Sequence, residues 1–180
     1  MALQNPDGNR AGNMKGIGDL IFKEAKGFGK SSSWYADRLN TYLSKEQSKL
    51  FSKAERYTCG VTEGELCFFG YNPKLIDKLP YYDTRPLVYV LQTFEDGFYG
   101  YNLHYTDPSF RSIIAKSLTQ DGDIKVAPDK CFRKYLCSQI TNTPMKVPKD
   151  SWESVAKLPT EDFVSRTGQR LNPSKVWSYT

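Results

Sequence analysis

His104 is the residue of this sequence best suited to catalysis, because it is the only histidine in the chain. An imidazole can act as a general base or activate a nucleophile near neutral pH. On a strand expected over 98–105, His104 alternates onto the same side as Asn102. No G-x-S-x-G elbow or cysteine motif supplies a partner nucleophile. The favoured interpretation is therefore a hydrogen-bonded, structural histidine, and a nuclease built around His104 or Asp129 is the alternative.

One glycine-rich segment has the Gly29-Lys30-Ser31 order of a phosphate-binding loop. The full G-x-x-x-x-G-K-[ST] pattern needs a second glycine five positions earlier, where the sequence has Glu24, and no strand is expected before it. Asp129 and its neighbour Lys130 are only a fragment of a metal-dependent nuclease pattern. We therefore expect no catalytic residue, cofactor, metal or small-molecule substrate.

The four cysteines raise the question of a metal site or a disulfide: Cys59, Cys67, Cys131 and Cys137. No two of them form a C-x-x-C pair, and one histidine cannot complete a site with two cysteines and two histidines. The intracellular setting that we expect favours reduced, structural thiols over a zinc site or a disulfide framework.

The composition predicts a soluble, mildly basic protein that is made inside a cell. The chain has 180 residues, enough for one ordinary core, and a formal charge of +5. Its longest apolar run, 87–91, is far shorter than the roughly 20 residues of a membrane helix, and its polar beginning is unlike a signal peptide. The charge is unevenly distributed, with +4 over 1–56, −4 over 57–110 and +5 over 111–180.

Residues 1–32 are expected to form an extended N-terminal arm, because they contain little apolar surface to offset the entropy of ordering them. The arm has a single apolar patch that we expect to contact a neighbouring subunit. An aromatic residue near the C-terminus is a further candidate contact, with packing on the chain's own barrel as the equal alternative. These predicted partner contacts are Ile17, Leu20, Ile21, Phe22 and Trp177.

The rest of the chain, 33–180, is expected to be a single globular domain that begins with a helix over 33–56. Ser33 can cap this helix, and apolar residues recur along it at helical spacing. A stripe of lysines follows another side: Lys45, Lys49 and Lys53. Such a stripe is usually a solvated face, and contact with nucleic acid is the alternative.

Residues 57–106 read as short antiparallel strands. Aromatic and β-branched residues dominate 65–71, 85–91 and 98–105, and Asp96-Gly97 supplies turn chemistry. Gly100 inside the last strand indicates a bulge or a close backbone approach. Because closure removes exposed edges, we expect an α+β fold in which a small antiparallel SH3-like β-barrel is flanked by helices.

Residues 107–180 are expected to be mainly helical. Asp107 and Pro108 are a strong helix start. Apolar residues at helical spacing predict one helix with a stripe of Phe110, Ile113, Ile114 and Leu118, and a second after Pro128 with Phe132, Tyr135, Leu136 and Ile140 on one face.

Several motifs, in order and spacing, resemble a family of virion proteins from T-even-like tailed bacteriophages that are often labelled DNA end protector proteins. The resemblance covers roughly 34–180, with Arg85 where an aromatic residue is expected and Tyr101 where leucine is expected. The motifs that carry it are 69–74 (Phe-Gly-Tyr-Asn-Pro-Lys), 79–83 (Leu-Pro-Tyr-Tyr-Asp), 85–88 (Arg-Pro-Leu-Val), 96–100 (Asp-Gly-Phe-Tyr-Gly), 102–105 (Asn-Leu-His-Tyr), Trp152, 158–164 (Leu-Pro-Thr-Glu-Asp-Phe-Val) and 176–177 (Val-Trp).

This resemblance implies a component of a virion that is made in the bacterial cytoplasm. We expect a non-enzymatic assembly protein, in the tail or baseplate, that contacts other phage structural proteins in a symmetric assembly and at most weakly contacts DNA. The alternative is a DNA end protector or head-completion protein, whose basic outer segments would bind phosphates irrespective of sequence. The modest net charge favours the assembly protein.

Overall fold

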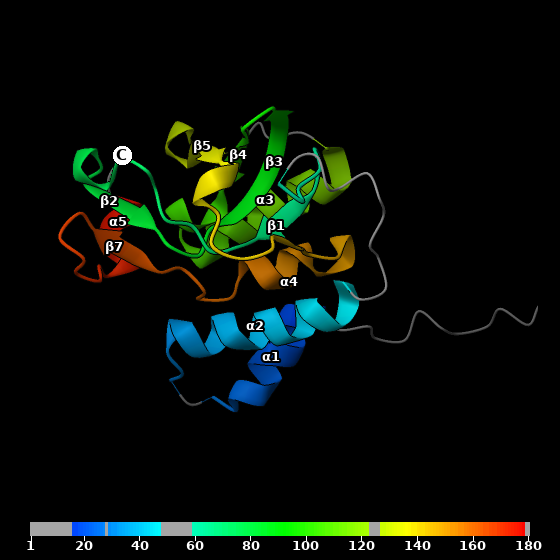
Figure 1. Cartoon of the computed structure of the whole chain (residues 1–180). Helices are drawn as coiled ribbons and strands as arrows, with labels where there is room; N and C mark the ends of the chain where they lie inside the picture. Colours follow the sequence, from blue (N-terminus) through cyan, green and yellow to red (C-terminus); the bar gives the residue numbers. More distant parts are fainter. Residues whose placement is uncertain (1–15, 28, 48–58, 123–126, 179–180) are drawn as a thin grey trace, which may run out of the picture.

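The computed structural model describes residues 16–27, 29–47, 59–122 and 127–178, and it has an α+β fold (Figure 1). Its main sheet is antiparallel, with five strands in the order β5-β4-β3-β1-β6. These strands are β1 (Leu66–Phe68), β3 (Leu87–Phe94), β4 (Gly97–Asn102), β5 (Phe132–Leu136) and β6 (Met145–Lys146).

A second, two-stranded sheet joins β2 (Tyr81–Asp83) to β7 (Phe163–Ser165) in antiparallel register. Over the described residues, β5 and β6 lie at opposite ends of the main sheet and do not pair with each other. The expected closed SH3-like barrel is therefore not confirmed, although the α+β class is. Two strands of the main sheet, β5 and β6, come from the region that was expected to be helical.

The β3–β4 hairpin is the longest pairing in the sheet and agrees with the sequence prediction. Glu95 and Asp96 form its two-residue turn, and Gly97 opens β4. The register shifts between Val90 and Gln92, opposite Gly100. A Cβ at Gly100 would lie 2.7 Å from the carbonyl oxygen of Tyr89, so the predicted close backbone approach is confirmed.

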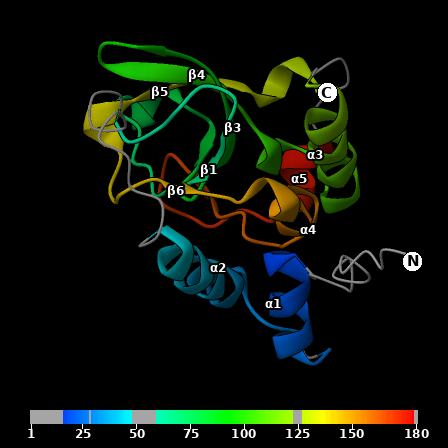
Figure 2. The ribbon, with the colours of Figure 1, turned by 90° about the vertical axis from the view of Figure 1, so that its right-hand side faces the viewer.

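Residues 17–25 are not part of an extended arm, because they form the helix α1 (Ile17–Ala25) and pack on the chain itself. Both α1 and α2 (Ser32–Gln47) lie on the same side of the molecule (Figures 1 and 2), where α1 packs against α2 and α4 (Trp152–Ala156), and α2 packs against β6. The backbone N–H groups at the start of α1 donate to the hydroxyls of Ser151 and Ser154. These helices give the amphipathic segment an intramolecular partner; residues 1–15 lie outside the described part.

The helix α2 begins earlier than predicted. Ser31, not Ser33, accepts from the backbone N–H of Trp34 through its hydroxyl, at 3.2 Å. Tyr35, Leu39 and Leu43 are buried on the inner face of the helix, as their spacing predicts. The predicted continuation over 48–56 lies outside the described residues.

The helix α3 (Pro108–Asp121) starts as predicted, because the Asp107 carboxylate accepts from the backbone N–H groups of Ser109 and Phe110. The predicted stripe is wrong at Ile113, which is 53% exposed, and the inner face instead contains Arg111. The helix predicted after Pro128 is also wrong. That segment forms two short 3-10 turns, η4 (Asp129–Cys131) and η5 (Cys137–Gln139), on either side of β5.

The main sheet has apolar clusters on both faces. Leu66, Phe68 and Leu87 pack against the helices, with Trp152 in the same cluster. On the other face Cys67, Phe69, Val88, Val90 and Phe98 pack with Tyr135 of β5. The remaining helix, α5 (Pro173–Ser178), contributes Val176 to a third cluster with Phe163 and Tyr105.

Candidate functional site: a buried histidine network beside a polar pocket

His104 lies at the centre of a buried polar network. It belongs to the 3-10 turn η3 (Leu103–Tyr105) that ends β4, and its ring has no exposed surface. Its Nδ1 lies 2.7 Å from Oδ2 of Asp83, and its Nε2 lies 2.9 Å from the hydroxyl of Thr160. Both partners are buried as well.

Asp83 also accepts three hydrogen bonds besides its contact with His104. Its Oδ2 accepts from the side-chain amide of Asn102, and its Oδ1 accepts from the backbone N–H groups of Arg85 and Asp162. Burial by itself raises the pKa of Asp83, but the electrostatic attraction of His104 and the hydrogen bonds from His104, Asn102 and Arg85 outweigh it. The pKa of Asp83 is therefore held below its ordinary value.

A hydroxyl, an imidazole and a carboxylate in this order are the groups of a nucleophilic triad. The triad mechanism requires the hydroxyl to reach a substrate, whereas Thr160 and His104 have no exposed surface. This arrangement can join β2, η3 and the segment before β7, and it favours the structural interpretation of His104.

Arg111 forms a second buried polar centre next to the first. Its guanidinium lies 2.9 Å from the carboxylate of Glu161 and donates to the carbonyls of Thr106 and Leu158. The ring of Trp177 lies 5.5 Å from this guanidinium, and its indole N–H donates to the carbonyl of His104. The predicted partner contact Trp177 therefore packs on the chain's own polar centre.

A surface pocket of about 440 Å³ lies beside the Asp83 network, between α2 and the end of β1. Arg85 reaches into it, 3.8 Å from the Asp37 carboxylate, and the Thr84 hydroxyl donates to Asp162. Most of its lining is polar, with aromatic residues beneath. The lining residues are Asp37, Asn40, Phe68, Phe69, Gly70, Tyr71, Asn72, Thr84, Arg85, Thr141, Asn142 and Asp162.

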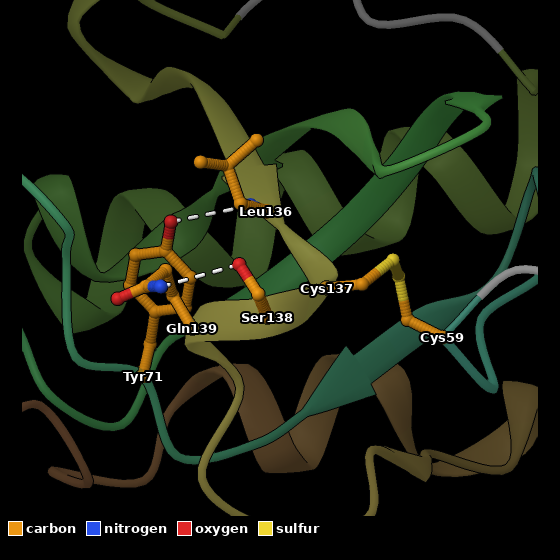
Figure 3. The surroundings of a disulfide bond; sticks show 6 residues. All are labelled: Cys59, Tyr71, Leu136, Cys137, Ser138 and Gln139. Atoms are coloured by element: carbon orange, nitrogen blue, oxygen red, sulfur yellow. Dashed lines mark hydrogen bonds between the residues drawn. A yellow bond between two sulfur atoms is a disulfide. The ribbon is translucent and has the colours of Figure 1, made fainter.

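The sequence suggests that all four cysteines are reduced, and this is wrong for two of them. Cys59 and Cys137 form a disulfide with Cα atoms 5.3 Å apart, close to the Tyr71 hydroxyl that accepts from the backbone N–H of Leu136 (Figure 3). The distance lies in the ordinary range for a disulfide. Cys67 and Cys131 are buried thiols outside the disulfide, as expected, and burial raises the pKa of Cys131 to about 11.

The predicted contacts in the arm separate into two groups. Ile17 and Ile21 are buried within the chain, whereas Leu20 and Phe22 are each 38% exposed. Of the lysine stripe, Lys45 is exposed with its ammonium 6.0 Å from the ring centre of Tyr42, while Lys49 and Lys53 lie outside the described residues.

The remaining candidate groups do not assemble into a second centre. Asp129 is exposed at the start of η4, a turn that packs against η3. Within the described residues, no group of three or more histidine, cysteine or acidic side chains could hold a metal ion. None of the helices in the same part of the chain is long and apolar enough to cross a membrane.

Sequence reasoning did not assign roles to Asp83, Thr160 or Arg111. Asp83 and Thr160 lie in the motifs 79–83 and 158–164, so the resemblance of these motifs to the phage family was the available signal for the two residues. For Arg111 the pattern gave no signal, because an arginine between apolar helix positions is normally solvated. In comparisons with known proteins, no family model, curated protein or solved structure matches this chain.

Proposed function

We propose that the chain is a non-enzymatic structural component of a tailed phage particle, in its tail or baseplate, that acts through contacts with other proteins. The observation that carries the non-enzymatic part is burial, since neither the ring of His104 nor the Thr160 side chain has exposed surface. A catalytic imidazole must reach its substrate. The phage setting rests on the resemblance of the motifs around this network.

The arrangement of the motifs supports an assembly role. The motif segments 79–83, 102–105 and 158–164 meet at the buried network, and 176–177 packs on it through Trp177. The hydrogen bonds that join these segments stabilise a rigid body with a defined surface, which an assembly subunit needs. We also propose that the main sheet is an incompletely closed SH3-like barrel. Its interior would be the apolar cluster that contains Phe69, Phe98 and Tyr135.

The direct test is quantitative mass spectrometry of gradient-purified particles of the phage that encodes the chain. We expect the protein at a fixed ratio to the tail proteins, in tails detached from heads as well as in whole particles. Host proteins that band with the particles serve as the control for carry-over. Absence from particles, or recovery only with heads, would contradict the tail assignment.

A DNA-end binder is the second candidate, and one feature of α2 favours it. Two cations lie beside the ring of Trp34, on the helix that carries Lys45. The Lys30 ammonium is 5.5 Å from the ring centre, and the Arg38 guanidinium, which also pairs with Glu24, is 5.8 Å from it. Cations beside an aromatic ring can bind a nucleic-acid end. This candidate predicts protection of linear duplex ends from exonuclease, with affinity that falls steeply with salt. Equal protection by the wild type and Trp34→Ala would count against this surface.

A further inference from the structure

The strand β5 is the terminal strand of the main sheet and pairs on one side only, with β4. It lies at the end of the molecule away from α1 and α2 (Figures 1 and 2). A terminal strand presents backbone N–H and C=O groups that can pair with another extended chain.

The register identifies which backbone groups of β5 face outward. The N–H of Cys137 donates to the carbonyl of Asp96 at 2.8 Å, which makes this a hydrogen-bonded pair. In an antiparallel ladder these pairs alternate with pairs whose groups point away from the partner. Phe132, Lys134 and Leu136 therefore direct their backbone groups outward.

Two of these three positions are already engaged. The N–H of Leu136 donates to the Tyr71 hydroxyl at 3.2 Å, and the carbonyl of Phe132 accepts from the Arg133 guanidinium at 3.3 Å (Figure 3 shows the first contact). Within the described part of the chain, the N–H and C=O of Lys134 have no partner. The open edge is therefore short and centred on Lys134.

The side chains beside this edge are apolar and cationic. Phe132 is 44% exposed and stacks on Tyr99 of β4, with ring centres 5.4 Å apart. The ammonium of Lys134 lies 4.9 Å from the ring centre of Phe94 and 5.9 Å from that of Tyr99. The acidic residues of the nearby β3–β4 turn make no ion pair with Lys134 in the described structure.

We propose that the β5 edge accepts an extended, acidic segment of a neighbouring protein as an added strand. An apolar residue of that segment would pack on Phe132, an Asp or Glu would pair with Lys134, and its backbone would satisfy the N–H and C=O of Lys134. This inference rests on the proposed assembly function and specifies the kind of partner.

Charge and hydrogen bonding select this occupant over two others. A second copy paired through β5 would bring together two strands that each contain Arg133 and Lys134, which is unfavourable for like charges. A nucleic-acid backbone offers acceptors for the Lys134 N–H but no amide donor for its carbonyl. A peptide backbone offers both a donor and an acceptor at the spacing of a paired strand.

The test is an NMR titration of the ¹⁵N-labelled full chain with two capped heptapeptides, Thr-Val-Thr-Glu-Thr-Val-Thr and its counterpart with Lys in place of Glu, whose apolar and charged residues share one face of an extended strand. We expect the acidic peptide to shift the amide signals of 132–136 with a Kd of about 1 mM or tighter. The basic peptide should bind about three- to tenfold more weakly. Lys134→Glu should reverse this preference, and Lys116→Glu, on exposed α3 surface, should not.

Any of four results would overturn the inference: no shift at 132–136, equal affinity for both peptides, no reversal in Lys134→Glu, or reversal in Lys116→Glu. Concentration-dependent changes at β5 without peptide would instead identify a second copy as the occupant. Tighter binding of oligo-dT at the same signals would identify nucleic acid. The titration uses purified protein, so its outcome is independent of whether the chain is found in particles.

Discussion

At the scale of single residues, the molecule is defined by two basic side chains with no exposed surface, His104 and Arg111. A buried charge is costly unless it is paired and hydrogen-bonded. Asp83 and Glu161 supply the pairing, and backbone carbonyls supply further acceptors for Arg111. Removing either carboxylate should therefore harm the fold more than removing an exposed one.

Replacement of Glu161 tests the pairing of Arg111. Glu161→Ala should lower the free energy of unfolding by about 3–5 kcal/mol, because it leaves a buried guanidinium without its carboxylate. Glu153 offers a matched control, since its ion pair with Lys157 is half-exposed, and Glu153→Ala should cost at most about 0.5 kcal/mol. Urea denaturation measures both, and similar costs for the two variants would contradict this account.

Asp83 should make stability fall in acid. Because its pKa is lowered in the folded state, the stability it contributes is present above the ordinary aspartate pKa of about 3.9 and is lost as pH falls through the lower folded value. Asp83→Asn should be less stable at neutral pH and should lose less stability between about pH 5 and pH 2. Unfolding at a series of pH values would show this. An unchanged acid slope, or an equal change in the exposed control Asp129→Asn, would refute it.

At the scale of elements, local signals predicted what local chemistry determines. Asp107 and Pro108 start α3 where expected, and the Asp96-Gly97 turn joins β3 to β4. The segment 132–136 was mistaken for helix because its apolar residues also fit helical spacing. Pairing with β4 overrides that preference, and no local pattern reports a partner more than thirty positions away. The buried network was unpredictable for the same reason, since Asp83, His104 and Thr160 meet only through tertiary structure.

The packing of α1 gives a prediction at this scale. Ile21 is fully buried among α1, α2 and α4, so Ile21→Ala should cost about 2–5 kcal/mol in the isolated chain. Leu20, its exposed neighbour on the same helix, should tolerate alanine within about 0.5 kcal/mol. Thermal and urea unfolding of the two variants would decide between an integrated helix and an arm. If both variants were as stable as the wild type, the result would support the extended arm expected from the sequence.

At the scale of the whole molecule, the Cys59–Cys137 disulfide joins positions 78 apart and encloses the strands β1 to β5 in one covalent loop. Neither spacing nor composition indicated this pairing, because it depends on β5 bringing Cys137 back beside Cys59. The intracellular setting expected from the sequence favoured reduced cysteines instead. A loop of this length strongly restricts the unfolded chain.

The disulfide should therefore contribute substantially to stability. Cys137→Ser should lower the free energy of unfolding by about 4–5 kcal/mol, and dithiothreitol should lower the melting temperature of the wild type toward that of the variant. The reductant should leave Cys137→Ser unchanged, which separates the bond from other effects of reduction. A wild type that is indifferent to dithiothreitol, with thiols that all react after denaturation, would show that the bond does not form.

The isolation of His104 also makes it a spectroscopic reporter. Since the chain contains one histidine, its imidazole signals in a proton NMR spectrum need no assignment by mutagenesis. Both ring nitrogens are held between Asp83 and Thr160, so a ring N–H proton should exchange slowly with water and resonate far downfield. The intensity of that single signal would report whether β2, β4 and the segment around Thr160 are packed together, during refolding or incorporation into a larger assembly. No label would have to be added to the protein.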